Sequence, residues 1–172
     1  MPSWHSILEE IRKQGSTHDI IRREYLTKLY RLTGRNVIVY YSGWLQKPGI
    51  QGSHVDDADK NGFMTAVHQL DRSKGLDLIL HTPGGETAAT ESLVDYLYLM
   101  FGTNIRAIIP QIALSAGTMI ACACREIIMG KHSSLGPIDP QLFGNISAHG
   151  IIEEFKRAHD EIKTDLSKIP VW

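Results

Sequence analysis

The residues best suited to chemistry lie in two turns, each preceded by an apolar segment. Residues 81–86 (His-Thr-Pro-Gly-Gly-Glu) follow the run 76–80, and residues 113–117 (Ala-Leu-Ser-Ala-Gly) follow the run 108–112. A serine at a sharp strand-to-helix turn can act as a nucleophile, and free main-chain N–H groups beside it can stabilise an oxyanion. Together the two turns predict acyl-transfer chemistry, and a serine peptidase in particular.

The first turn has the composition of an anion-binding site. Pro83 fixes its own φ, and the two glycines after it allow backbone conformations closed to other residues. A helix that begins near Glu86 would point unpaired N–H groups and the positive end of its dipole at the turn. We expect Gly84, Gly85 and His81 to line an oxyanion or substrate site. The alternative is an ordinary strand-to-helix turn.

The second turn resembles a nucleophile elbow. Ser115 lies between Ala113 and Gly117 in an A-x-S-x-G pattern, close to G-x-S-x-G, and a strained turn leaves no room for larger neighbours. The amide of Ala116 is the expected second oxyanion donor. Serine is also a frequent helix N-cap, and a serine before an apolar helix is usually just that. The Pro-Gly-Gly turn upstream favours the catalytic interpretation.

Around these turns, strands and helices are expected to alternate. Apolar periodicity predicts strands over 37–41, 76–80, 105–109 and 125–129, helices over 56–70, 86–101, 115–124 and 148–168, and loops over 43–56 and 130–147. This alternation predicts an α/β fold with a mostly parallel, buried central sheet. Right-handed crossovers bring the βα turns to one sheet edge, so we expect the two turns to meet there.

The chain is expected to comprise an N-terminal helical arm over 1–33, made of two helices within 5–31, and a catalytic domain over 34–172. Its 172 residues are enough for a full core. The last four residues, Ile-Pro-Val-Trp, are apolar. We therefore expect part of the domain, or a partner surface, to lie beyond them.

Charge and composition exclude several functions. A net charge of −1 indicates no basic surface for nucleic acid. No apolar run reaches the roughly 18 residues of a membrane span. The N-terminal residues lack the pattern of a signal peptide. A cytoplasmic protein is therefore expected. Cys122 and Cys124 would point to different helix faces, which argues against a disulfide. No histidine has a partner at ligand spacing and no P-loop occurs, so we expect no metal or cofactor.

Three ordered motifs resemble those of the Clp-fold serine peptidases. This group includes the Clp protease proteolytic subunit and signal peptide peptidase A, and shares its fold with the crotonases. The sequence is most similar to the serine dehydrogenase proteinase (SDH) family, through the motifs at 81–85, 113–118 and 135–141 (Leu-Gly-Pro-Ile-Asp-Pro-Gln). The resemblance covers residues 36–165. It implies a ClpP/crotonase-like fold of repeated ββα units, ATP-independent hydrolysis of peptide or protein substrates, and a homo-oligomer.

The motifs do not identify the general base. Alignment with the Clp protease subunit puts Ile138 where that enzyme has its histidine, so the chain departs from the Ser-His-Asp pattern. A lysine base, as in signal peptide peptidases, would need desolvation. Candidates are Lys131 and His132 in the loop that leads toward the site, with Asp139 nearby to orient a base or to cap the next segment. Three further lysines are weaker candidates: Lys156, Lys163 and Lys168.

Two other functions fit the same residues. In a crotonase-like acyl-CoA enzyme, the two amides would polarise a thioester carbonyl, Asp139 would act as acid or base, and Ser115 would be incidental. A catalytically inactive Clp-fold scaffold would explain the missing histidine at Ile138.

Overall fold

The computed structural model describes residue 9, residues 18–142 and residues 146–171. Within it the chain forms two compact units, divided between Gly136 and Pro137. The predicted arm over 1–33 and domain over 34–172 are a different division, which stays a prediction. The first of the two helices expected in that arm lies outside the described residues except for Glu9.

A parallel sheet of four strands forms the centre of the first unit, in the order β1-β2-β3-β5. Its strands are β1 Asn36–Tyr41, β2 Leu76–His81, β3 Ile105–Ile109 and β5 Glu126–Met129. Each strand predicted from the sequence is present, with bounds that differ by one residue at most. The mixed α/β class with a mostly parallel sheet is therefore confirmed.

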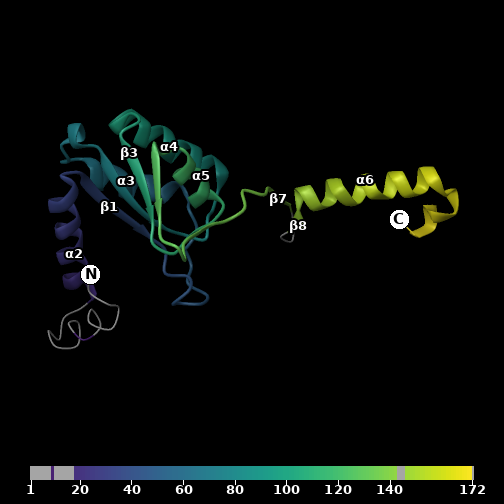
Figure 1. Ribbon diagram of the computed structural model, residues 1–172, viewed down its shortest axis with the longest axis horizontal. Helices are drawn as coiled ribbons and strands as arrows, with labels where there is room; N and C mark the ends of the chain where they lie inside the picture. The colour runs from purple at the N-terminus through teal and green to yellow at the C-terminus, as the bar shows by residue number, and fades with distance from the viewer. Residues whose placement is uncertain (1–8, 10–17, 143–145, 172) are drawn as a thin grey trace. The chain divides into compact units, whose positions relative to one another are not determined.

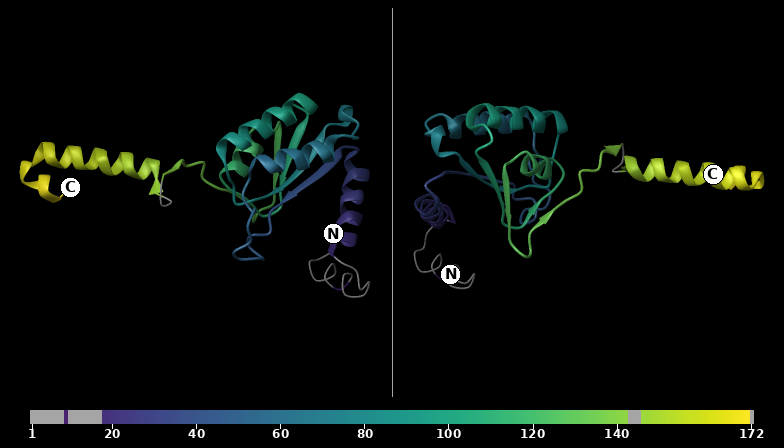
Figure 2. Two further views of the ribbon diagram at one scale, coloured as in Figure 1. Left: turned by 180° about the vertical axis from the view of Figure 1, so that it is seen from behind. Right: turned by 45° about the horizontal axis from the view of Figure 1, so that its top comes forward.

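Helices α3 (Asp57–Val67), α4 (Thr87–Phe101) and α5 (Ala116–Cys122) cover one face of this sheet (Figures 1 and 2). Alternation along β2 explains why: Leu76, Leu78 and Leu80 are fully buried against the helices. The residues between them point to the opposite face. Helix α2 (His18–Thr33) contacts β1, and a short 3₁₀ turn, η1 (Arg72–Lys74), precedes β2.

A second parallel pair extends the sheet region toward the candidate site. Strand β4 (Ile112–Ala113) pairs with β6 (Ser134–Leu135), and an isolated bridge joins Ala113 to Thr82. The expectation that 130–147 is entirely loop was therefore wrong. Strands of two residues are too short to show an alternating pattern in sequence.

The second unit contains a short antiparallel pair and a long helix. Strands β7 (Gln141–Leu142) and β8 (Ile146–Ser147) precede α6 (Ala148–Thr164) and the 3₁₀ segment η2 (Leu166–Val171). The helix expected to run to 168 ends earlier because the Asp165 backbone is extended and its carboxylate accepts hydrogen bonds from Ser167. No helix in the described part of the chain is long and apolar enough to cross a membrane.

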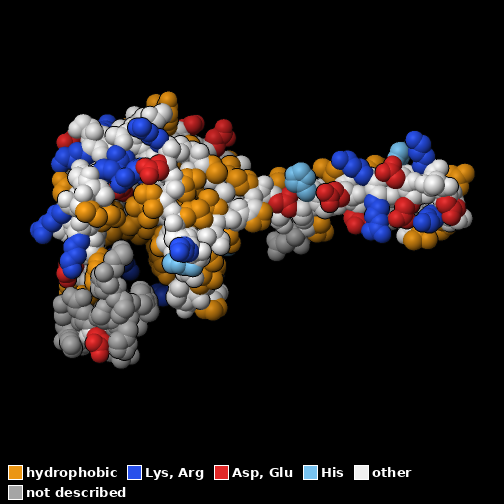
Figure 3. All heavy atoms as spheres, in the orientation of Figure 1, with side chains coloured by type: hydrophobic (Ala, Val, Ile, Leu, Met, Phe, Trp, Pro, Cys, Tyr) orange, Lys and Arg blue, Asp and Glu red, His pale blue; other side chains and the backbone are white. Residues whose placement is uncertain are grey.

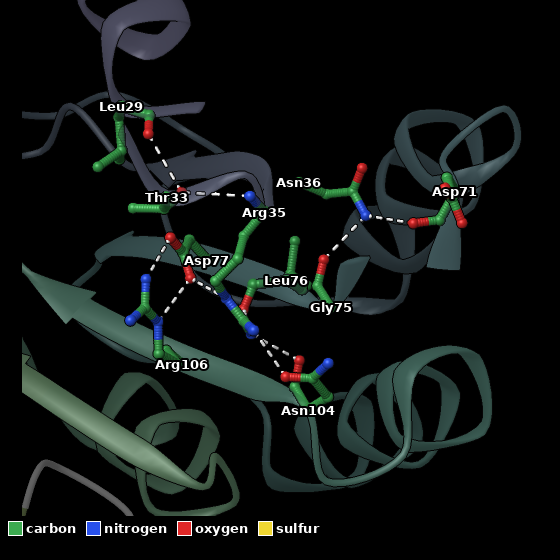
Figure 4. A network of polar contacts seen from close by, with 10 residues as sticks. All are labelled: Leu29, Thr33, Arg35, Asn36, Asp71, Gly75, Leu76, Asp77, Asn104 and Arg106. Carbon is green, nitrogen blue, oxygen red and sulfur yellow. Dashed lines mark hydrogen bonds and ion pairs between the residues drawn. The ribbon is translucent and has the colours of Figure 1, made fainter. Parts of the chain in front are cut away.

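A buried ion network holds the amino ends of the strands together. Asp77 on β2 is fully buried and accepts hydrogen bonds from Arg35 Nε at 2.6 Å and from Arg106 Nε and Nη2 at 2.8 Å (Figure 4). Arg35 also donates to the side chain of Asn104 at 2.6 Å. Burial by itself would raise the pKa of the Asp77 carboxyl, but the bonds from the two arginines outweigh it and hold that pKa below its usual value.

Replacing Asp77 with Asn should lower the free energy of unfolding by about 3 kcal/mol at neutral pH, because the arginines lose their buried carboxylate. Because the folded pKa is depressed, the ionised group stabilises the fold above about pH 4 and this contribution disappears as the pH falls further. Urea unfolding between pH 3 and pH 7 measures both effects. The control is Asp95→Asn on the exposed side of α4. Equal losses in both variants would contradict the assignment.

Candidate active site

Ser115 has an unusual backbone conformation. Its φ is 45° and its ψ is −113°, and no other non-glycine residue in the described part of the chain has a positive φ. Such a conformation costs about 1–3 kcal/mol and persists only where the surrounding structure imposes it. Ser115 precedes α5, yet its side chain makes no capping hydrogen bond. The hydroxyl is therefore not used in the way that the N-cap interpretation requires.

Small residues surround this elbow because the side chains of neighbouring segments lie close to it. A Cβ on Gly117 would lie 2.5 Å from Thr82 Cγ2 and 3.1 Å from Ala113 Cβ. Ala113 itself is fully buried. The A-x-S-x-G pattern thus has the steric origin expected from the sequence.

The Pro-Gly-Gly turn packs directly against Ser115. Gly84 has a φ of 102°, and a Cβ on it would lie 2.6 Å from Ser115 Cβ and 3.2 Å from Ala116 N. The two turns are joined by the bridge between Thr82 and Ala113, with Leu114 N donating to Thr82 O at 3.0 Å. The predicted convergence of the two turns is therefore confirmed.

Val55 holds the other side of the Pro-Gly-Gly turn. Its N–H donates to Gly84 O at 2.8 Å, and its carbonyl accepts from Glu86 N at 2.9 Å. This parallel pairing uses the residues on either side of Gly85 and leaves the polar groups of Gly85 pointing away from Val55. The sequence pattern did not predict the pairing of Val55 with Gly85, because Val55 lies in a segment with loop composition.

The two proposed oxyanion donors have no acceptor. Among the described residues, neither the N–H of Gly85 nor that of Ala116 makes a hydrogen bond. Ala116 is the first residue of α5, where the N–H groups have no partner within the helix. Both amides thus lack an acceptor within the described part of the chain, and their role as oxyanion donors stays a prediction.

His81 lies at the end of β2, immediately before this turn, and is only 2% exposed. Its ring stacks on Tyr41, with 4.9 Å between centroids, and tilts against Trp44 at 4.6 Å. Neither ring nitrogen has a hydrogen-bond partner in the described part of the chain. Burial lowers the pKa of the imidazole below its usual value, which the main chain of Ile112 opposes in part. His81 is thus a buried side chain that packs against two aromatic rings, and its expected place in the lining of the site stays a prediction.

Neither candidate base of the first unit makes a hydrogen bond with the serine. Ser115 Oγ has no hydrogen-bond partner among the described residues. His132 is exposed, and its Nε2 lies 3.0 Å from Pro110 O, at the start of the segment that leads through β4 to the elbow. Lys131 is also exposed in that turn. Both stay predictions as bases.

The remaining candidates belong to the second unit. Asp139 has a buried Oδ1 without a hydrogen-bond partner in the described part of the chain. Lys168 forms an ion pair with Glu161 at 3.3 Å, while Lys156 and Lys163 are exposed on α6. Among the described residues, no cluster of three or more His, Cys, Asp or Glu could hold a metal ion, and both cysteines are free.

The strain at Ser115 predicts that a glycine variant is more stable than an alanine variant at this position, which is the opposite of the usual order in a helix. Ser115→Gly should unfold with a free energy about 1 kcal/mol larger than Ser115→Ala, because glycine tolerates this φ and alanine does not. Urea titrations of both variants measure the difference. At Ser92, inside α4, the same two substitutions should rank the other way. A more stable alanine variant at 115 would show that the elbow is unstrained.

The sequence matches the family described as ClpP-like SDH-type serine proteinase over residues 20–169. It is also similar to two uncharacterized proteins of Methanocaldococcus jannaschii. It is 35% identical to MJ1495 over 107 residues, which cover 62% of this chain and 36% of the relative. It is 38% identical to MJ0137 over 95 residues, which cover 55% of this chain and 32% of the relative. The matched part thus spans about a third of the length of each relative. The extent of the family match shows that this chain belongs to the ClpP-like SDH-type serine proteinases.

Proposed function

We propose that this protein is a serine peptidase that hydrolyses peptide bonds through an acyl-enzyme on Ser115. The main support is the contact between the Gly84 backbone and the strained Ser115 elbow. It brings a hydroxyl without a hydrogen-bond partner among the described residues next to a turn with a free amide. Membership of a serine proteinase family supports the same chemistry.

In the first step, Ser115 Oγ attacks the peptide carbonyl carbon and forms a C–O bond. A general base accepts the hydroxyl proton, and the N–H groups of Gly85 and Ala116 donate to the oxyanion. The C–N bond then breaks, and the base returns the proton to the leaving amine. Water attacks the resulting ester in the same way and regenerates the serine.

The identity of the base is part of the proposal. Lys131, His132 and Asp139 keep the roles expected from the sequence, with a lysine or histidine accepting the proton and Asp139 orienting it. Since Ser115 Oγ has no partner among the described residues, we propose that the base approaches it when the substrate binds or when copies assemble. Catalytic hydrogen bonds in free enzymes commonly tighten only in the complex.

A fluorophosphonate probe tests the nucleophile directly. Wild-type protein should gain one phosphonyl group on Ser115, located by peptide mass spectrometry, and Ser115→Ala should gain none. Ser133→Ala is the matched control, since Ser133 Oγ is occupied with a hydrogen bond to Ile109 O at 2.6 Å. An unlabelled wild type would exclude an activated Ser115 and favour the scaffold interpretation.

The expected homo-oligomer is also part of the proposal. Helix α6 carries three apolar side chains with large exposed fractions, Ile151 at 44%, Ile152 at 50% and Phe155 at 74%. Charged side chains of both signs lie along the same helix (Figure 3). We propose that a second copy of this chain covers the apolar face. The substrate is a peptide or protein, and the cytoplasmic location expected from the sequence stays a prediction.

Placing a lysine in that face should weaken assembly. Phe155→Lys removes a large apolar side chain from the proposed contact, which should raise the dissociation constant about 30-fold, corresponding to about 2 kcal/mol. Light scattering across a concentration series measures the mass. Glu153→Lys introduces the same residue on the polar side of α6 and should leave the mass unchanged. Identical masses for wild type and both variants would count against α6 as the contact.

A further inference from the structure

Thr118 is a buried residue that the chemistry described above does not use. It lies in the first turn of α5, three residues after Ser115, and is 6% exposed. Its hydroxyl lies 2.8 Å from Ala113 O and 3.0 Å from Gly136 O. A threonine inside a helix usually donates to the carbonyl four residues earlier. Thr118 instead reaches two carbonyls outside the helix.

These two carbonyls belong to segments that flank the elbow. Ala113 ends β4, two residues before Ser115, and Gly136 is the first residue after β6. Ala113 O also accepts a hydrogen bond from Gly136 N at 3.2 Å. A hydroxyl has one proton to donate, so Thr118 either shares it between the carbonyls or alternates. In both cases the hydroxyl links α5 to the end of β4 and to the segment that follows β6.

The packing at this point leaves little freedom for the segments to move apart or together. A Cβ on Gly136 would lie 3.1 Å from Leu114 Cα, so the chain after β6 already touches the residue before Ser115. The strained backbone of Ser115 would relax if its flanking segments could shift. The hydrogen bonds of Thr118 to Ala113 and Gly136 oppose such a shift. On the other side of the elbow, Gly84 of the first turn packs against Ser115.

We propose that Thr118 is a positioning residue, whose hydroxyl holds the Ser115 elbow in its strained conformation and fixes where the chain leaves β6. This inference rests on the proposed function in so far as the elbow presents the nucleophile. The holding of the elbow is itself a property of the fold and can be measured without any reaction.

The kinetic test compares Thr118→Val with Thr118→Ser. Valine keeps the shape of the side chain and loses the hydroxyl, and serine keeps the hydroxyl. We expect Thr118→Val to lower the maximal rate of fluorophosphonate labelling of Ser115 about 10- to 100-fold, at an unchanged half-saturating probe concentration, since a small displacement of a reacting group has effects of this size. Thr118→Ser should restore most of the rate.

Thr33→Val provides the matched control for this series. It removes a hydroxyl that donates to Leu29 O at 3.1 Å in α2, and it should label at the wild-type rate. All rates are compared at a temperature where circular dichroism shows each variant to be folded. Wild-type labelling of Thr118→Val, or a Thr118→Ser variant as slow as Thr118→Val, would overturn the proposal.

A thermal double-mutant cycle tests the same proposal independently of chemistry. If Thr118 holds the strain, the gain in Tm from Ser115→Gly over Ser115→Ala should shrink in the Thr118→Val background. Equal gains in both backgrounds would overturn the proposal. An unlabelled wild type together with a reduced gain would overturn the proposed function and support the role of Thr118.

Discussion

Two parallel bridges fix the Pro-Gly-Gly turn in space, with Val55 on one side and Ala113 on the other. Main-chain hydrogen bonds make these bridges, so they do not depend on the side chains of the turn itself. They place Gly84 against Ser115, at a distance where any side chain on Gly84 would collide with the serine. This close approach brings the Pro-Gly-Gly turn and the Ser115 elbow into one candidate site.

The close approach of Gly84 and Ser115 is accompanied by backbone strain at Ser115, and the packing of the rest of the unit offsets the free energy of this strain. Ser115 adopts a positive φ that serine normally avoids, and neighbouring segments pack closely around it. Leu76, Leu78 and Leu80 bury one face of β2 under the helices, and Asp77 binds two arginines from the other face. The strand that carries the Pro-Gly-Gly turn is therefore fixed along its whole length before it reaches the site. The rigid sheet thus supports the strained backbone of Ser115.

Periodicity and composition predicted the four long strands and the helices around them, because each of these elements buries a regular apolar face. The alternation of strands and helices predicted that the sheet is mostly parallel. Periodicity and composition did not predict β4, β6, β7 and β8, because each of these strands has only two residues and so shows no alternating pattern. The end of α6 was missed for a different reason. It depends on a local hydrogen bond between Asp165 and Ser167, which competes with a helical pattern that continues.

The amino-acid sequence alone determined which residues could do chemistry here. Segments that approach each other this closely need residues with small side chains. The small residues around Ser115 and the two glycines after Pro83 are therefore visible in the sequence. Only the tertiary structure decided that these segments touch, that the amides of Gly85 and Ala116 stay free among the described residues, and that His81 is enclosed between Tyr41 and Trp44. Contacts between segments far apart in sequence depend on strand order and register, and no local pattern encodes either of them.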